Sequence, residues 1–364
     1  KGTNENQWTP IGTNDTPFTG TFEGNNHTIS GLHIDNSNTA GNYYGLFGYV
    51  KKGTVQNLTV SGSVTAVFAG GVVGWNDGGS VANCHNQAEV ATNDQTFLDA
   101  CVGGVVGWNE GGTVANCRNT GRVSHSISQS YAGGVVGKNY SRIDSAVSTV
   151  TNCRNAGPVT ASKGYCGGVV GYNGSNGRVA NCCNTGPVTG NGGYPGGVVG
   201  HNYIGTVASC CNTGPVTSSG SCGGVVGWNA GGTAANCYNA NPVTSSGSSP
   251  YVGGVVGRNN TTGGTGAAVM NCYNTGMVTS DSSCGGVVGS NGNSSSVTHC
   301  YFLQDASHNA GLPGVGSGES ASAGVTALDS TSFASGQVAW ELQNWWDNHA
   351  LEGEEGQVWG QKLD

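Results

Sequence analysis

The chain has 364 residues, of which 67 are glycine and only 9% are charged. So much glycine excludes a mostly helical fold, because each glycine inside a helix costs about 1 kcal/mol relative to alanine. The low charge excludes a charge-rich disordered chain. The net charge of −8 argues against nucleic acid as a partner. No apolar run approaches the roughly 20 residues of a membrane-spanning helix, so we expect no membrane insertion in this fragment.

The first predicted element is an irregular coil between Trp8 and Ile34. Two short stretches rich in aromatic and β-branched residues, Phe18–Phe22 and His27–Leu32, favour strands. Such a coil would cover the unpaired strand edge that the end of a stacked array exposes.

A repeat of 27 to 34 residues follows. The sequence Gly-Gly-Val-Val-Gly starts at Gly70, Gly103, Gly133, Gly167, Gly196, Gly223, Gly253 and Gly285. Each unit continues with an Asn two positions later, then a segment like Val-x-Asn-Cys, then a turn like Asn-Thr-Gly-Pro-Val. Repeats at a fixed period predict a solenoid or a propeller rather than an ordinary globular domain.

The repeat favours one coil of a parallel β-helix per unit. Glycine and β-branched residues stand where ankyrin or tetratricopeptide units need helices, and a propeller blade usually needs about 40 residues or more. We expect three strands of four or five residues in each coil, with nine to ten coils over residues 1–310. Neighbouring coils would lie about 4.8 Å apart, which stacks like residues in columns. We expect valine columns inside, and Asn at left-handed corners and in side-chain stacks.

Two further segments are expected after the repeats. Residues 311–331 contain a Gly/Ser-rich run and are predicted to be a connector, and residues 332–364 are predicted to be an acidic cap. Within the cap, Phe333 to Asn344 favours a short helix, with Val338, Leu342 and Trp345 on one face. Val358 to Lys362 favours a final strand.

The cysteines are predicted to be packing residues. Eight occupy one column, with Leu58 at the same place in the first unit, which indicates a column facing the core: Cys84, Cys117, Cys153, Cys182, Cys210, Cys237, Cys272 and Cys300. Zinc needs paired or clustered ligands, whereas these residues lie along a line, so we expect no metal site and no cofactor. Cys166, Cys222 and Cys284 precede the Gly-Gly pair and are also predicted to pack.

Cys183 and Cys211 differ from the other cysteines. Each follows a core cysteine in neighbouring coils, in a column predicted to face water. One coil spacing lies within the Cα range of a disulfide, so a Cys183–Cys211 bond is a candidate. Two free thiols are the alternative, because direct pairing between coils often has poor geometry.

Catalysis by acidic residues is restricted to a few positions. The sequence has no Asp or Glu between Ser145 and Ser280, and a glycosidase needs two carboxyl groups about 5–10 Å apart. Asp77 and Glu110 hold equivalent positions in consecutive units, so they form the one suggestive pair. The stronger interpretation is that they are solvated acids, because both lie in Gly-Gly turns and Ala230 replaces them in a later unit.

A column of aromatic and basic residues is the better candidate for binding. It follows the glycine motif at Tyr49, Trp75, Trp108, Lys138, Tyr172, His201, Trp228, Arg258 and Ser290. Trp75, Trp108, Tyr172 and Trp228 are the predicted ligand-binding residues, because aromatic faces suit sugar rings or a protein partner. The alternative is that the rings stack on one another and cover the glycine corners.

The chain resembles the GLUG-motif repeats of large bacterial surface proteins. The resemblance rests on Gly45-Leu46-Phe47-Gly48, on Trp8 to Gly12 and Phe18 to Ile29, and on the Gly-Gly-Val-Val-Gly series, over residues 8 to about 302. It implies export and a right-handed parallel β-helix. It implies no activity, although some members accompany immunoglobulin A metallopeptidases.

Together these features predict an all-β parallel solenoid from an exported bacterial surface protein. We expect a non-enzymatic, monomeric stalk or adhesion surface, outside the cell, with a host or matrix glycan or protein as partner. The alternatives are a glycan-active enzyme that uses Asp77 and Glu110, and a carbohydrate-binding module that uses the aromatic column.

Overall fold

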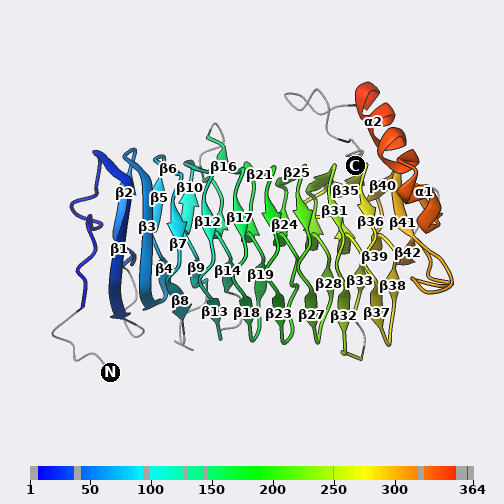
Figure 1. Cartoon of the computed structure of the whole chain (residues 1–364), viewed down its shortest axis with the longest axis horizontal. Helices are drawn as coiled ribbons and strands as arrows, with labels where there is room; N and C mark the ends of the chain where they lie inside the picture. The colour runs from blue at the N-terminus through cyan, green and yellow to red at the C-terminus, as the bar shows by residue number, and fades with distance from the viewer. Residues whose placement is uncertain are drawn as a thin grey trace.

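The protein is a rod of stacked coils in the computed structural model (Figure 1). The structure describes residues 7–36, 42–92, 99–126, 130–142, 146–248, 250–318, 324–349 and 359. Every pairing between the strands is parallel, and each strand pairs with the equivalent strand of the next coil. The predicted all-β parallel solenoid is confirmed, with about nine turns.

A ten-stranded sheet carries the residues that follow each Gly-Gly-Val-Val-Gly motif. Its strands are β2 (Phe47–Lys51), β5 (Val73–Asp77), β10 (Val106–Glu110), β15 (Val136–Asn139), β20 (Val170–Asn173), β24 (Val199–Tyr203), β29 (Val226–Ala230), β34 (Val256–Asn260), β39 (Val288–Asn291) and β42 (Val315–Gly318). We call this sheet A.

A 26-stranded sheet, sheet B, holds three columns of strands. It starts with β1 (Thr21–Asn36) and β3 (Thr54–Ala66). The first column continues with β6 (Ser80–Ala82), β11 (Thr113–Ala115), β16 (Ser148–Thr151), β21 (Gly177–Ala180), β25 (Thr206–Ala208), β30 (Thr233–Ala235), β35 (Ala268–Met270) and β40 (Ser296–Thr298). The second has β7 (His85–Asn86), β12 (Arg118–Asn119), β17 (Arg154–Asn155), β22 (Cys183–Asn184), β26 (Cys211–Asn212), β31 (Tyr238–Asn239), β36 (Tyr273–Asn274), β41 (Cys300–Leu303) and β43 (Val325–Leu328). The third has β8 (Glu89–Thr92), β13 (Val123–His125), β18 (Val159–Ala161), β23 (Val188–Gly190), β27 (Val216–Ser218), β32 (Val243–Ser245) and β37 (Val278–Ser280).

Two short sheets precede the Gly-Gly corners. One contains β4 (Phe68–Gly70), β9 (Cys101–Gly103), β14 (Tyr131–Gly133) and β19 (Tyr165–Gly167), and the other contains β28 (Cys222–Gly223), β33 (Val252–Gly253) and β38 (Cys284–Gly285). Bridges through Gly196 join them into one column. A typical coil therefore has five strands, of two to five residues, and the prediction of three longer strands is wrong. Extra corners at the Gly pair and at a left-handed Asn divide the predicted strands.

Left-handed residues make one of these corners. Ser209 and His299 make this corner in two coils, with φ of 53° and 51°. In seven other coils the corner is the Asn that precedes the core Cys or Leu, with a φ between 53° and 57°: Asn57, Asn83, Asn116, Asn152, Asn181, Asn236 and Asn271. Asn tolerates this region better than other residues with a β-carbon. The strands β6 to β40 of the first column of sheet B therefore end one residue before this corner, and the strands β7 to β36 of the second column begin two residues after it.

Valine columns fill the interior, as predicted. The two valines of each glycine motif are fully buried, as are valines of sheet B such as Val150, Val179 and Val207. Equivalent valines pair in register, for example Val136 with Val170 and Val170 with Val199. Branched side chains suit this pleated surface, because they pack well against their neighbours above and below.

The N-terminal segment forms a first coil, as predicted. Strand β1 pairs with β3, Ile11 bridges Phe47, and Phe18 bridges Val50. Larger side chains fill this coil, where the rings of Phe18 and Phe22 pack against Phe47 at 5.0 and 5.2 Å between ring centroids.

The C-terminal region differs from the prediction in two ways. Residues 311–331 are not only a connector, because they contain β42 and β43, which extend sheets A and B. Helices α1 (Ser330–Ala334) and α2 (Gln337–His349) follow, and α2 buries Val338, Leu342 and Trp346, with Trp346 in place of the expected Trp345. The predicted strand at Val358–Lys362 lies outside the described residues, apart from Trp359.

Helix α2 lies along the side of the last coils (Figure 1). Val338, Leu342 and Trp359 pack with Tyr301 and with the half-buried Tyr273. The residue that follows each core cysteine, such as Arg118, Cys183 or Tyr273, was predicted to lie in a column that faces water. At the C-terminal end of this column the prediction is wrong. The column changes from Arg118 and Arg154 to Tyr238, Tyr273 and Tyr301, and these rings give the helix an apolar surface.

Candidate functional site

The predicted aromatic column exists on sheet A. Strand pairing places Tyr49 beside Trp75 and Trp75 beside Trp108, and it continues in order through Lys138, Tyr172, His201, Trp228, Arg258 and Ser290. The four residues predicted to bind a ligand, Trp75, Trp108, Tyr172 and Trp228, are all half-buried. Each stands in the same place of its coil, after the two core valines.

Most neighbouring rings of this column contact one another through their faces, whereas Tyr172 and His201 meet edge to face at 78° between planes. Tyr49 stacks on Trp75 with 4.4 Å between centroids and 8° between planes, and Trp75 stacks on Trp108 at 5.3 Å and 21°. The basic residues do not interrupt the stack: the Lys138 ammonium lies 4.9 Å from the Trp108 ring centre, and the Arg258 guanidinium lies 5.3 Å from that of Trp228. Such cation–π contacts stabilise the column further. Ligand binding at these rings stays a prediction. The ring faces that a ligand would need already contact a neighbouring ring or a basic side chain, which does not favour binding.

A second set of aromatic residues lies beside the column, and the sequence reasoning missed it. Tyr131 stacks on Tyr165 at 5.8 Å, and Tyr165 stacks on Tyr194 at 5.9 Å. The ring centroid of Tyr165 also lies 4.6 Å from that of His201, which belongs to the column. The signal was present in the sequence, because these tyrosines all stand two positions before a Gly-Gly pair. The two sets form one aromatic layer over the glycine corners.

His201 is buried in this layer. Its ring stacks on Trp228 with 4.6 Å between centroids and 11° between planes, and only 7% of the residue is exposed. Neither ring nitrogen has a hydrogen-bond partner in the described part of the chain. Burial therefore lowers the pKa of His201 to about 3, because the charged imidazole would lose its hydration.

This burial predicts a loss of stability in acid. The unfolded chain binds a proton at His201 as the pH falls through the ordinary pKa of 6.5, whereas the folded chain stays neutral down to about pH 3. The stabilisation is complete above pH 6.5 and is lost progressively between pH 6.5 and 3. One pKa unit corresponds to about 1.4 kcal/mol. Between pH 7 and pH 4.5 we therefore expect the free energy of unfolding to fall by about 3 kcal/mol more in the wild-type chain than in His201→Phe. Urea unfolding of both proteins at the two pH values measures this difference, and equal pH dependence would contradict it.

The two candidate catalytic acids are register neighbours, as predicted. Asp77 pairs with Glu110 between β5 and β10. The structure gives each carboxylate a protein partner: Asp77 accepts a 2.7 Å hydrogen bond from the Tyr49 hydroxyl, and Glu110 forms a two-pronged ion pair with Arg142 at 3.0 and 3.2 Å. Burial raises the pKa of Glu110, and Arg142 opposes this rise. The expectation of solvated acids in these turns is wrong for Glu110, which is only 8% exposed.

Two ladders of buried Asn side chains run along the rod. The first continues through Asn76, Asn109, Asn139, Asn173, Asn202, Asn229, Asn259 and Asn291, and the second through Asn86, Asn119, Asn155, Asn184, Asn212, Asn239 and Asn274. In both, each Nδ2 donates to the Oδ1 of the next coil at 2.7–2.8 Å. Nearly all of these amides also donate to a carbonyl of their own coil, as Asn184 does to Gly186 at 2.8 Å, whereas Asn259 donates to the Ser296 carbonyl of the next coil at 3.2 Å. Buried polar networks that are satisfied in this way specify one register.

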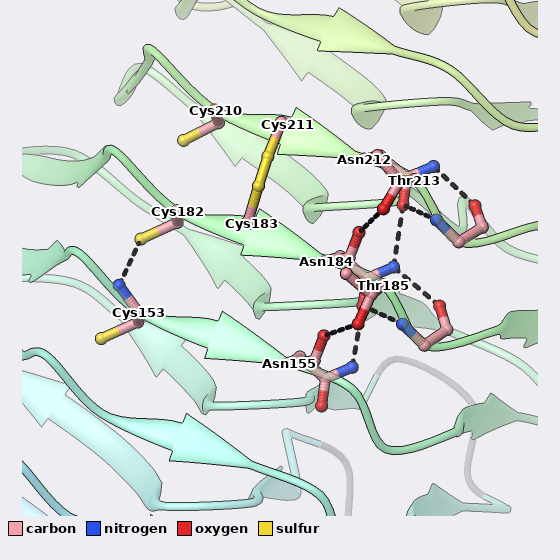
Figure 2. Close-up of a disulfide and its surroundings, with 12 residues drawn as sticks. Cys153, Asn155, Cys182, Cys183, Asn184, Thr185, Cys210, Cys211, Asn212 and Thr213 are labelled. Atoms are coloured by element: carbon pink, nitrogen blue, oxygen red, sulfur yellow. Dashed lines mark hydrogen bonds between the residues drawn. A yellow bond between two sulfur atoms is a disulfide. The ribbon is translucent and has the colours of Figure 1, made fainter.

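The core cysteines form the predicted buried column. All eight are at most 1% exposed, and neighbouring members interact, as where the Cys153 amide donates to the Cys182 sulfur at 3.4 Å (Figure 2). The second set pairs as expected, with Cys166 beside Ala132 and Cys222 beside Val252. Burial raises the pKa of Cys166 to about 12, so this residue stays a protonated thiol at neutral pH.

Cys183 and Cys211 are joined by a disulfide between adjacent coils (Figure 2). Their Cα atoms are 4.7 Å apart, and β22 and β26 pair directly at these residues. Figure 2 shows the sulfurs of Cys182 and Cys210 on the other side of the strands, away from this bond. The disulfide therefore joins two coils on the outer side of sheet B, whereas the thiols of Cys182 and Cys210 pack in the core of the solenoid.

Removing this bond is expected to lower stability. The bond closes a loop between residues 28 positions apart, and a loop of this size predicts about 3.6 kcal/mol of stabilisation through the unfolded chain. The double variant Cys183→Ser/Cys211→Ser should therefore unfold at lower urea concentration than the wild-type chain. Dithiothreitol should lower the wild-type midpoint and leave that of the variant unchanged. A wild-type midpoint that does not respond to dithiothreitol would contradict this prediction, as would a non-reducing peptide map without the Cys183–Cys211 link.

The described ranges contain no group of three or more His, Cys, Asp or Glu side chains that could hold a metal ion. The helices of these ranges are also too short or too polar to cross a bilayer.

Two sequence comparisons match parts of this chain. The model of the GLUG motif matches residues 99–124. A protein named "Putative Gly-rich membrane protein", from Evansella cellulosilytica, is 43% identical over 61 residues, which are 16% of this chain and 7% of that protein.

A solved structure also aligns with the chain. It is described as a putative immunoglobulin A1 protease from Bacteroides ovatus, is 18% identical, and aligns over 92% of this chain and 90% of its own with a TM-score of 0.40. The chain carries a GLUG motif at residues 99–124, within a parallel β-solenoid of repeated coils.

Proposed function

We propose that this chain is a rigid, non-enzymatic stalk or display surface of an exported bacterial surface protein. The observation that supports the proposal best is the pair of Asn ladders, which link eight and seven coils by consecutive side-chain hydrogen bonds. A rod that bends would have to break or stretch these bonds in a core that excludes water. The matching segment of a Gly-rich membrane protein supports a place at the cell surface.

Small-angle X-ray scattering of the purified chain tests the rigidity. We expect the profile of a stiff rod, and a deletion of residues 133–195 should shorten it by about 10 Å, since two coils are removed in register. A profile typical of a flexible chain would contradict the proposal. A shortened variant that fails to fold would contradict the equivalence of the coils.

The enzymatic alternative depends on Asp77 and Glu110. Both carboxylates already have partners in the protein, and Glu110 would have to leave Arg142 to act on a substrate. We therefore expect no turnover when the chain is incubated with a panel of glycans and peptides. Turnover by the wild-type chain that is lost in Asp77→Asn or Glu110→Gln would overturn the non-enzymatic proposal and favour a glycan-active enzyme.

A further inference from the structure

A cavity of about 430 Å³ lies at the N-terminal end of the rod, outside the repeats. The first coil, the segment before β2 and strand β2 form its walls. This volume falls within the range of small-molecule pockets. The cavity begins where the aromatic column begins, because Tyr49 is both the first ring of the stack and part of the wall.

The lining has the chemistry of a site for an uncharged, hydroxyl-rich ligand. Trp8, Tyr43 and Tyr49 contribute aromatic rings, and amides and hydroxyls come from residues such as Asn42 and Thr13. None of the thirteen described residues that line the cavity carries a charge. A charged ligand would therefore find no ion-pair partner in the lining, whereas a sugar uses apolar ring contacts and hydrogen bonds together.

Trp8 differs from the rings of the column in having room for a ligand. It is 40% exposed, and it has no ring contact with another aromatic residue in the described part of the chain. Its orientation is set at two points: its backbone amide donates to the His33 carbonyl at 2.8 Å, and its indole Nε1 donates to the Leu46 carbonyl at 3.0 Å. A ring that is oriented before binding loses little entropy when a ligand covers it.

The wall beside Trp8 is also held in place. The Gln7 side chain donates to the Asp35 carbonyl at 3.1 Å and accepts from the Asn36 amide at 3.2 Å. These bonds attach the segment that contains Gln7 and Trp8 to the end of β1. The cavity is therefore supported by hydrogen bonds to the solenoid, as precise binding requires.

We propose that this cavity binds an uncharged sugar of a glycan chain, with Trp8 stacking on the sugar ring. The inference rests on the proposed display function and deepens it, because it gives the rod an adhesive end. The proposed sugar site therefore lies at the end of the rod and not along the aromatic column, where rings such as Trp75 and Trp108 stack on each other.

Saturation-transfer difference NMR tests the proposal on the whole chain. The probes are methyl α-mannoside, methyl β-galactoside, N-acetylglucosamine and sialyllactose. We expect signals from at least one neutral sugar and about tenfold weaker binding in Trp8→Ala, since Trp is enriched among the few residues that supply most of the binding energy. Trp340→Ala is the matched control, because Trp340 is 64% exposed on α2 and lies outside the cavity.

Three results would overturn the inference: no binding of any neutral sugar, binding by sialyllactose alone, or equal loss in Trp8→Ala and Trp340→Ala. Circular dichroism of both variants shows whether the fold is retained. Thr9→Trp provides a second test, since a bulky ring at this lining position should block the cavity without removing Trp8. Failure here leaves the stiff rod measured by scattering unaffected, so the two proposals are tested separately.

Discussion

Replacing Gly168 by alanine is expected to disrupt the middle of the solenoid. A β-carbon at this position would overlap the Gly197 carbonyl oxygen of the next coil and the side-chain amide of Asn184. The Asn184 amide is held by hydrogen bonds to Gly186 and Asn212, and the Gly197 oxygen belongs to the backbone, so the coils would have to separate. We expect a loss on the order of 4 kcal/mol in the free energy of unfolding, in the range of severe packing defects. Urea unfolding measures the loss, and hydrogen exchange should locate it in the coils around Gly168.

Gly190→Ala is the matched control for Gly168→Ala. Strand pairing places Gly190 between Ala161 and Ser218, so neighbouring coils already carry a β-carbon at this position. The nearest atom to an added β-carbon is 3.0 Å away, in the Pro195 ring. We expect a change within about 1 kcal/mol, as for other tolerated substitutions. Equal losses in the two variants would show that glycine matters here only for backbone entropy.

Asn184→Leu is expected to be the second severe substitution. It would leave one N–H of the Asn155 amide without its acceptor and remove the Asn184 donor from the Asn212 oxygen, in a buried part of the core. It would also break both hydrogen bonds between the Asn184 side chain and the Gly186 backbone. A buried polar group that loses its partner costs about 1–3 kcal/mol, so we expect about 4 kcal/mol in total. Hydrogen exchange of the backbone amides around Asn155 and Asn212 should rise together with the loss of stability measured in urea.

Asn76→Val provides the control at the end of a ladder. The preceding coil has Val50 at the equivalent position, and the Asn76 side-chain oxygen has no partner in the described part of the chain. The substitution therefore breaks one bond between coils, to Asn109, and we expect about half the cost of Asn184→Leu. Equal costs at the end and in the middle would contradict the view that the ladder stabilises through paired contacts on both sides.

The columns were predictable because the repeat makes position in the sequence equivalent to position on the rod. Once the Gly-Gly motifs are aligned, Trp75 must lie beside Trp108 and Cys153 beside Cys182, whatever the shape of the coil. The structure confirms these pairings. The first Asn ladder also follows from the aligned motifs, whereas the second was visible only as part of a turn motif.

The shape of each coil was less predictable. Glycine pairs and left-handed Asn residues were recognised as corners, but their number in a coil depends on local backbone angles that composition does not reveal. The use of the aromatic rings was also beyond the sequence. Whether a ring face contacts a ligand or the next ring depends on its orientation, and in this column rings such as Trp75 and Trp108 lie nearly parallel.

The C-terminal region shows a different limit. The segment at Val315–Gly318 was interpreted as a connector because glycine and serine dominate it, yet it pairs with β39 as the earlier coils pair with each other. An existing sheet edge supplies hydrogen bonds to a strand of weak propensity, so context overrides composition. The site of α2 could have been inferred from the change of Arg154 to Tyr238, Tyr273 and Tyr301 along one column.

The most direct test of the stacked coils is a series of distances along one column. Spin labels attached through unnatural amino acids, which avoid the native thiols, would pair Thr279 in turn with Thr189, Thr160, Ser124, Ala91 and Thr65. These positions lie in one continuous register on sheet B. Double electron–electron resonance should give distances that grow by about 4.8 Å for every coil, from about 14 to about 34 Å between backbones. Distances that fail to grow in equal steps, or that fall again with sequence separation, would contradict the parallel in-register solenoid.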